Sequence, residues 1–284
     1  HGKDILPAIG ELAPDTLKPA IARLLGETLP APARVEPQQV FPRPPTMCVA
    51  CPHLGVYYTL SQLRNITIAG DIGCYTLGAG HPWNALDTTI SMGASMGVAL
   101  GLDKGRGESD KGKRIVAVRA VGMTGGQNNP ANGRDIYGNE APRVDFAKLA
   151  EALGVKRERI RVLDPYELPT LFKALREETK IDEPSVIITN RPCVLIEDYE
   201  KLAPYKVIDD KCTGCGNCVE VGCPAIHVTR REKVIKPSGK EVELAFVNIE
   251  TAACTGCGLC VQPCAPEAIV PAQPFQPVSF IKPI

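Results

Sequence analysis

Hydrophobic and polar positions along the middle of the chain follow two different periods. Short apolar runs that end in glycine or aspartate predict buried strands, and longer stretches with apolar residues three or four positions apart predict helices. The strands are expected at 66–69, 114–118, 160–163 and 185–189, and the helices at 90–102, 145–153 and 168–179. The helix at 90–102 is rich in glycine and alanine, which predicts close packing. Because strands and helices alternate, this region predicts an α/β domain with a largely parallel sheet.

The two ends of the chain have a different character. A short helical pattern at 17–25 precedes a stretch with proline at positions 30, 32, 37, 42, 44 and 45, which predicts an extended arm. Short strands at 234–235 and 246–249 lie between two cysteine runs, and the tail is apolar and rich in proline. We therefore expect an arm at 1–46, an α/β domain at 47–204, a small α+β domain at 205–272 and an extended tail at 273–284.

The overall charge is balanced, with 32 basic and 32 acidic residues among 284. This balance argues against nucleic acid or a membrane surface as a partner, and no apolar run approaches the roughly 20 residues that a membrane helix needs. No secretory signal is visible, so we expect a cytoplasmic protein. The chain starts with His1 rather than Met, and we expect further sequence upstream of it.

Eight of the twelve cysteines form two similar runs, the second of which, at Cys254, begins 42 residues after the first, at Cys212. Glycines between the cysteines of each run let backbone amides turn toward the sulfur atoms. This spacing is typical of proteins that hold two [4Fe–4S] clusters, in which the last cysteine of each run ligates the other cluster. The assignment is therefore Cys212, Cys215, Cys218 and Cys264 for one cluster, and Cys254, Cys257, Cys260 and Cys223 for the other.

Two features depart from the usual spacing of such runs. One additional residue precedes Cys223, and Ala265 stands where proline usually follows the last cysteine. Both indicate altered loops rather than lost ligands. Zinc ribbons use two separated cysteine pairs, and disulfide frameworks occur mainly in short secreted proteins, so the spacing favours iron–sulfur clusters and an electron-transfer function.

Four cysteines remain outside these runs. Cys48 and Cys51 form a pair after the arm, and Cys74 and Cys193 each follow a predicted strand. Loops after parallel strands meet at one edge of a sheet, so four thiols in such places can converge on a third cluster. Free cysteine is also among the most buried residues, and the spacing alone leaves both interpretations open.

Four motifs of the α/β region occur in the same order in a known family. They are Met-Cys-Val-Ala-Cys-Pro-His at 47–53, Gly-Asp-Ile-Gly-Cys-Tyr-Thr-Leu-Gly at 70–78, Ser-Met-Gly-Ala-Ser-Met-Gly at 91–97 and Met-Thr-Gly-Gly-Gln at 123–127. From about residue 5 to 270, the sequence resembles the thiamine-diphosphate-dependent 2-oxoacid:ferredoxin oxidoreductases, in particular the large (alpha) subunits of the indolepyruvate enzymes. The resemblance implies a thiamine-diphosphate-binding domain followed by a ferredoxin-like domain with two clusters.

The resemblance also implies roles for individual residues. It implies a [4Fe–4S] cluster beside the thiamine on Cys48, Cys51, Cys74 and Cys193, which brings the expected number of clusters to three. The residues expected to border thiamine diphosphate are Asp71, Gly73, Cys74, Gly93, Ala94, Ser95 and Met96, with Thr124, Gly125, Gly126 and Gln127 beside the diphosphate and the carbonyl of Ala120 facing Mg²⁺. His53 is expected near the reacting carbon as a catalytic residue, or alternatively as a loop histidine that caps the cluster.

The implied reaction is the oxidative decarboxylation of an arylpyruvate, such as indolepyruvate, to an acyl-coenzyme A, with electrons passing through the clusters to external ferredoxin. The implied partners are a second (beta) subunit, ferredoxin, coenzyme A and the 2-oxoacid substrate, in a hetero-oligomer. The alternative is a non-catalytic iron–sulfur subunit that only transfers electrons.

Two departures from the family affect thiamine chemistry. In the family, a strand like 114–118 runs into Gly-Asp-Ser or Gly-Asp-Gly, whose aspartate binds Mg²⁺. Here Val118 is followed directly by Arg119, and on the order of 30 residues of a βαβ unit are absent. We expect a stretch omitted at this point; the alternative is a true deletion, which would abolish thiamine chemistry. The family's domains for the thiamine pyrimidine and an activating glutamate do not precede His1, so we expect another chain or segment to supply them.

Overall fold

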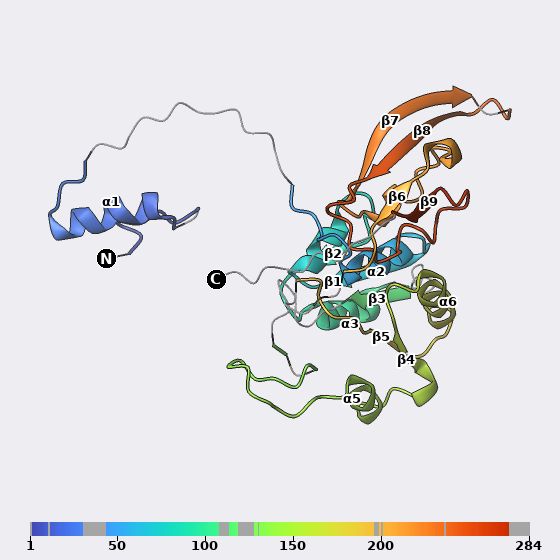
Figure 1. Ribbon diagram of the computed structural model, residues 1–284. Coiled ribbons are helices and arrows are strands. Elements are labelled where there is room, and N and C mark those ends of the chain that lie inside the picture. The colour runs from blue at the N-terminus through green and yellow to red at the C-terminus, as the bar shows by residue number, and fades with distance from the viewer. Residues whose placement is uncertain are drawn as a thin grey trace. The chain divides into compact units, whose positions relative to one another are not determined.

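The computed structural model describes residues 2–10, 12–30, 44–107, 114–118, 128–129, 131–195, 199, 201–235 and 237–272 (Figure 1). The chain divides into two compact units, His1–Pro44 and Pro45–Ile284. The first unit contains α1 (Pro14–Leu25), which starts with proline and ends at Gly26 in the left-handed conformation. The helix predicted at 17–25 is therefore confirmed and starts earlier, while the proline-rich residues 31–43 and the tail at 273–284 lie outside the described residues.

The α/β part of the second unit is built on parallel strands. β1 (Ile66–Gly70) pairs in parallel with β3 (Arg114–Val118) and, near its end, with β2 (Thr88–Thr89), which gives the strand order β2-β1-β3. β4 (Ile160–Leu163) and β5 (Val186–Thr189) form a second parallel pair. The four predicted strands are confirmed as parallel strands, although within the described ranges they form two small sheets.

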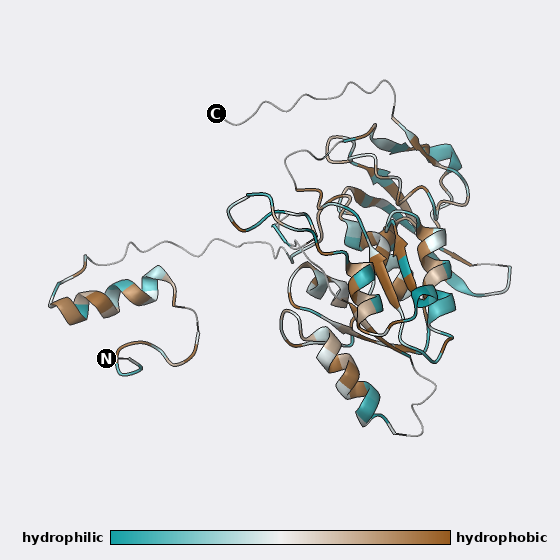
Figure 2. Ribbon diagram, turned by 90° about the horizontal axis from the view of Figure 1, so that it is seen from below, coloured by the Kyte–Doolittle hydropathy of each residue, from teal (hydrophilic) through white to brown (hydrophobic). Residues whose placement is uncertain are grey.

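The helices of this part cover the strands. They are α2 (Pro52–Ser61), α3 (Ser95–Gly105), α5 (Phe146–Ala152) and α6 (Leu168–Glu178). α5 begins after Asp145, whose carboxylate accepts hydrogen bonds from two N–H groups of the first turn, as an N-cap does. In Figure 2 the strands at the centre are hydrophobic, and the helices beside them carry both hydrophobic and hydrophilic positions. The main core forms where α2 packs against α6, with Leu54, Tyr57 and Leu171 buried.

The helix predicted at 90–102 is confirmed only from Ser95 on, and its glycines do not make the close contacts expected of them. α3 begins at Ser95, because Gly93 adopts a φ of 83°, which a right-handed helix does not contain. A Cβ atom added at Gly97 would meet no other atom within 4 Å. Met96 and Leu100 are each 60% exposed. Gly97 and Gly101 therefore make no close contact with the described residues, although α3 packs against β1 and β3 and Ser95 is fully buried.

The C-terminal part of this unit is an α+β segment whose first and last strands pair with each other. β6 (Tyr205–Val207) pairs antiparallel with β9 (Ile269–Pro271), so that the start and the end of the segment meet. β7 (Ile226–Ile235) and β8 (Glu241–Ile249) form a long antiparallel hairpin that extends away from the segment (Figure 1). The short strands predicted at 234–235 and 246–249 are only parts of this hairpin. No helix in the described ranges is long and apolar enough to span a membrane.

Candidate iron–sulfur and cofactor sites

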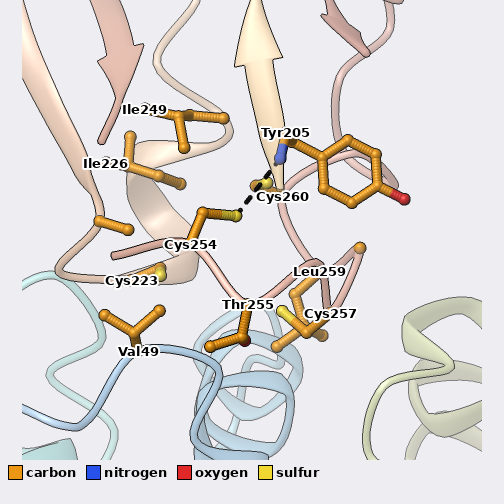
Figure 3. Close-up of a pocket in the computed structure, with 12 residues that line it drawn as sticks. Val49, Tyr205, Cys223, Ile226, Ile249, Cys254, Thr255, Cys257, Leu259 and Cys260 are labelled. Atoms are coloured by element: carbon orange, nitrogen blue, oxygen red, sulfur yellow. Dashed lines mark hydrogen bonds between the residues drawn. The ribbon is translucent and has the colours of Figure 1, made fainter. Parts of the chain in front are cut away.

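One small cavity of the C-terminal segment is surrounded by cysteines from both runs (Figure 3). Its wall contains Cys223 of the first run and Cys254, Cys257 and Cys260 of the second. Ile226, Ile249 and Leu259 make much of the remaining wall apolar. The structure therefore brings together the four thiols that the crossed assignment predicts for one cluster.

The tight turns of the second run depend on glycine. Gly256 and Gly258 have φ values of 76° and 77°, a conformation that glycine adopts without steric cost. A Cβ atom added at Gly256 would lie only 2.5 Å from the carbonyl oxygen of Ala203. The loop can therefore approach the start of the segment only because this position lacks a side chain.

A second cavity lies at the other end of the same segment. The cysteines in its wall are Cys212, Cys215, Cys218 and Cys264, which are the other crossed set. Ala245 and Val247 of β8 close one side, and the N–H of Ala245 donates a 2.7 Å hydrogen bond to the carbonyl of Gly214. This bond fixes the loop of the first run on the base of the hairpin. Cys215 is exposed, whereas Cys218 is buried.

Burial and mutual repulsion disfavour the charged form of these thiols. The pKa of Cys218 is raised to about 11, first by burial and then by the charges of Cys215, Cys264 and Cys212. Burial also raises the pKa of Cys257 to about 11, against a lowering effect of the Leu259 N–H. A group of buried thiols with such pKa values is stabilised as thiolates only by positive charge placed among them, which metal ions supply.

The donor set fits iron–sulfur clusters better than a single ion. In the described part of the chain, no three Cys, His, Asp or Glu side chains form a group that would hold one metal ion. The thiols instead surround a cavity, as ligands of a cubane do. Tyr205 N–H donates a 3.4 Å hydrogen bond to Cys254 Sγ (Figure 3), and the buried Thr255 hydroxyl in the wall has no partner among the described residues. All twelve cysteines are free, so the structure contains no disulfide framework.

The four remaining cysteines lie near one another. Cys51 precedes α2, Cys74 starts a 3₁₀ turn shortly after β1, and Cys193 follows β5. The pKa of Cys51 is raised to about 12 by burial, which the N–H of His53 opposes, and further by the charges of Cys48, Cys74 and Cys193. Burial raises the pKa of Cys48 as well, followed by the charges of Cys193 and Cys74. The four thiols therefore lie within electrostatic range of one another.

His53 lies in the first turn of α2, beside this third set. Its ring packs on the ring of Tyr75, with 4.3 Å between their centres and 36° between their planes. Burial lowers the pKa of His53 to about 4. The imidazole is therefore neutral near pH 7, so it can accept or donate a proton but provides no fixed positive charge.

The residues expected at thiamine diphosphate come together at the carboxyl end of β1. Asp71, which is 2% exposed, accepts a 2.8 Å hydrogen bond from the N–H of Ser95 at the start of α3. Gly73, with φ 129° and ψ −148°, turns the chain between Asp71 and Cys74, and Gly93 and Ala94 directly precede α3. The hydroxyls of Ser95 and Thr89 are buried without a hydrogen-bond partner in the described ranges, as groups that await a ligand are. The other expected contacts lie outside the described residues: Ala120, Thr124, Gly125, Gly126 and Gln127.

Some residues at these sites were not predicted from the sequence. Val49 contributes to the wall of the first cavity although it lies more than 150 residues before Cys223 in the chain. Thr89, Tyr205 and Thr255 were also missed. The only available signal was position, because Val49 and Thr255 each stand between two cysteines of a Cys-x-x-Cys pair.

Family models match two separate parts of the chain. The C-terminal TPP-binding domain of thiamine pyrophosphate enzymes matches residues 115–189, and a 4Fe-4S dicluster domain matches residues 205–265. Together with the sites above, these matches define a protein that combines a domain of thiamine pyrophosphate enzymes with a 4Fe-4S dicluster domain. The parallel-sheet α/β part and the following 4Fe-4S part agree with the fold class predicted from the sequence.

More specifically, the chain is similar to the IorA subunits of indolepyruvate oxidoreductase, which confirms the resemblance found in the sequence. It is 30% identical to that subunit of Pyrococcus abyssi over 292 residues, which cover 83% of this chain and 45% of the relative. For Methanothermobacter marburgensis the identity is 31% over 263 residues, with 80% of this chain and 42% of the relative covered. The chain thus spans less than half the length of these relatives. No solved structure matches it.

Proposed function

We propose that the chain is part of a thiamine-diphosphate-dependent 2-oxoacid:ferredoxin oxidoreductase that converts an arylpyruvate such as indolepyruvate to an acyl-coenzyme A. The observation that best supports this function is that the proposed thiamine site, the third thiol set and the first cysteine cavity adjoin one another within one unit. Cys74 of the third thiol set lies three residues after Asp71 at the proposed thiamine edge, and Val49 from the loop of the same set lines the first cavity. A path for electrons therefore runs from the thiamine edge toward the clusters.

We assign three [4Fe–4S] clusters to the twelve thiols. The third set is Cys48, Cys51, Cys74 and Cys193, and the crossed sets in a two-cluster ferredoxin-like domain are those that line the two cavities. Such clusters accept single electrons at low potential. The backbone N–H groups of His53, Tyr205 and Leu259, which point at thiol sulfurs, stabilise the negative charge of the thiolates. Twelve free cysteines also support a reducing compartment, the cytoplasm.

We place thiamine diphosphate at the carboxyl end of β1. When bound, this cofactor supplies a carbanion-stabilising centre for decarboxylation. Asp71 holds the start of α3 in place through Ser95 N–H, and the free hydroxyls of Ser95 and Thr89 are available to donate hydrogen bonds at this edge. His53, between Cys51 and Tyr75, is the proposed catalytic group that moves a proton.

The matched interval of the relatives contains residues that have no counterpart in this sequence. The alignment with the Pyrococcus abyssi subunit extends over 292 positions, more than the 284 residues of the whole chain, yet includes only 83% of them. The relative therefore carries residues within the matched interval that this chain lacks. We infer that they include the segment expected between Val118 and Arg119, whose aspartate would bind Mg²⁺. A second subunit, the pyrimidine-binding part and ferredoxin complete the proposed hetero-oligomer.

The test is anaerobic purification of the chain within its complex, followed by analysis of iron, acid-labile sulfide and thiamine. About twelve irons per chain support three clusters, and about eight support two. Indolepyruvate- and coenzyme-A-dependent reduction of ferredoxin tests the reaction itself. Colourless protein that contains zinc instead of iron and sulfide contradicts the proposal.

A second candidate function is that of a non-catalytic electron-transfer subunit. The direct junction of Val118 and Arg119 favours it, because a strand that passes straight into the following loop leaves no place for the Mg²⁺-binding aspartate. Thiamine analysis separates the two candidates. A stoichiometric amount of thiamine diphosphate supports the enzyme, and its absence from a freshly prepared, active complex supports the electron carrier.

A further inference from the structure

The loop Cys48–Cys51 is shared by two of the proposed iron–sulfur sites. Its ends are thiols of the third set, while Val49 between them lines the cavity of Cys223, Cys254, Cys257 and Cys260. Figure 3 shows the Val49 side chain directed at this cavity from a segment that is distant in sequence. Burial raises the pKa of Cys223, and the backbone N–H of Ala50 lies near enough to this thiol to oppose the rise. One short loop therefore carries ligands of one site and both a wall and a hydrogen-bond donor of the next.

Ala50 holds this loop in an unfavourable conformation. It is fully buried and has a φ of 55°, in the left-handed region that residues with a Cβ atom rarely adopt. Residues keep such a conformation only when the surrounding structure enforces it, and they occur most often at functional sites. The contacts of the Ala50 backbone show what enforces it here.

Tyr166, in the loop between β4 and α6, binds the carbonyl group of Ala50. Its hydroxyl donates a hydrogen bond to the carbonyl oxygen of Ala50, and the residue is only 5% exposed. The carbonyl of Tyr166 accepts a 2.7 Å hydrogen bond from Nε2 of Gln262, which lies between Cys260 and Cys264 in the sequence. Tyr166 therefore connects the shared loop with the loop of the second cysteine run.

The ring of Tyr166 also contacts the loop that carries Cys193. The guanidinium of Arg191, two residues before Cys193, lies 3.9 Å from the centre of this ring. Arg191 donates two hydrogen bonds, of 2.8 and 2.7 Å, to the carboxylate of Asp164, and the same carboxylate accepts a 2.9 Å bond from the N–H of Tyr166. Main chain, ring and hydroxyl of Tyr166 are thus each fixed by a different ligand-bearing loop.

We propose that Tyr166 is a positioning residue that holds the shared loop between the two sites and keeps the Ala50 N–H directed at Cys223. It thereby sets the reduction potential of the cluster at Cys223, Cys254, Cys257 and Cys260. The inference rests on the proposed assignment of these thiols to [4Fe–4S] clusters. A hydrogen bond to a ligating sulfur favours the more negative, reduced state of a cluster. Weakening it therefore lowers the potential of that cluster and leaves the cluster at the exposed Cys215 unchanged.

The experiment compares Tyr166→Phe with Tyr199→Phe in the intact complex. Tyr199 is the matched control, because its hydroxyl lies 3.3 Å from that of Tyr166 and its removal leaves the bond to Ala50 in place. Each protein is reduced stepwise with dithionite, without substrate, and the cluster signals are followed by electron paramagnetic resonance. In Tyr166→Phe one cluster shifts to a lower potential, and in Tyr199→Phe none does. Equal potentials in Tyr166→Phe and wild type, or equal shifts in both variants, overturn the proposal.

Ala50→Gly provides a second arm. Glycine adopts the left-handed conformation without cost, so the loop no longer needs the Tyr166 hydroxyl. In the Ala50→Gly background, Tyr166→Phe therefore shifts the reduction potential of the cluster less than it does in the wild-type background. If Tyr166→Phe alone loses iron, the double variant retains it. A double variant with the full shift, or without recovered iron, shows that Tyr166 acts by packing alone and overturns the proposal. Wild-type protein without iron–sulfur clusters contradicts the proposed function instead, so the two failures are distinguishable.

Discussion

The two regions of the second unit differ in where the parts of their sites come from. Around the cysteine cavities, all eight thiols and most of the apolar wall come from one continuous segment, which β6 and β9 close. At the carboxyl end of β1, Asp71 and Ser95 come from two separate segments, and the expected diphosphate loop lies outside the described residues. A site encoded by local spacing can be complete within one segment, whereas a site assembled from distant segments depends on all of them.

The largest expected effect comes from single cysteine substitutions that test which thiols share a site. Cys254 and Cys264 belong to the same run but line different cavities. Cys254→Ser and Cys223→Ser should therefore each lose the same cluster, about four irons per chain, because a cubane needs all four of its thiolates. Anaerobic iron and sulfide analysis, together with electron paramagnetic resonance of the reduced protein, identifies the missing cluster.

Cys264→Ser is the internal control for this comparison. It should remove the other cluster, with Cys212, Cys215 and Cys218 as the remaining thiols of its cavity. If Cys264→Ser instead abolishes the same signal as Cys254→Ser, each run holds its own cluster, and the crossed assignment is wrong.

A smaller effect is expected from a glycine that closes the second run. Gly256→Ala places a Cβ atom 2.5 Å from the Ala203 carbonyl oxygen in a left-handed conformation, whereas Gly239→Ala has the same kind of φ, 77°, with no atom within 4 Å. The clash adds about 2 kcal/mol to the cost of the conformation. Iron release to a chelator should therefore be about thirtyfold faster in Gly256→Ala than in Gly239→Ala. Equal rates in the two variants would mean that the loop moves away from Ala203 without loss.

The cysteine runs were predictable because the chemistry needs a fixed local spacing. The same holds for strands such as β4, whose apolar run has clear ends, and for the Asp145 cap of α5. α2 was missed because it is buried on nearly all sides, so its sequence shows no amphipathic period. The hairpin β7–β8 was underestimated because its outer half is exposed and charged and is held by cross-strand ion pairs such as Lys233–Glu241.

Contacts between distant segments were the part that the sequence could not supply. Nothing in the spacing of Val49 or Tyr166 indicates that they meet the second cysteine run, since that contact depends on how two parts of the unit pack. The start of α3 was misplaced for a related reason. Gly93 was counted as a small helical residue, but the turn that brings Ser95 to Asp71 requires its positive φ. Local sequence patterns therefore predict secondary-structure elements and cysteine runs, whereas tertiary contacts determine where elements start and which distant segments meet.

The smallest expected effect concerns the thiamine edge and asks whether it is independent of the cysteine cavities. Asp71→Asn keeps the size of the side chain and an oxygen that can accept the Ser95 N–H, but removes the negative charge from this hydrogen bond. Hydrogen bonds to charged groups are stronger than neutral ones by about 1 kcal/mol, so thiamine diphosphate should bind about fivefold more weakly. Calorimetric titration of the intact complex with thiamine diphosphate and Mg²⁺ measures this change.

The matched control for this variant is Asp103→Asn on α3, the helix whose start is bonded to Asp71. Asp103 forms a 2.7 Å ion pair with Arg106 at the surface, away from the start of α3, so its loss should leave thiamine diphosphate affinity unchanged. The clusters of the two cysteine cavities should be retained in both variants, because neither residue lines either cavity. Loss of the cavity clusters in Asp71→Asn would show that the two regions depend on each other. Unchanged affinity in that variant would place thiamine diphosphate away from the end of β1.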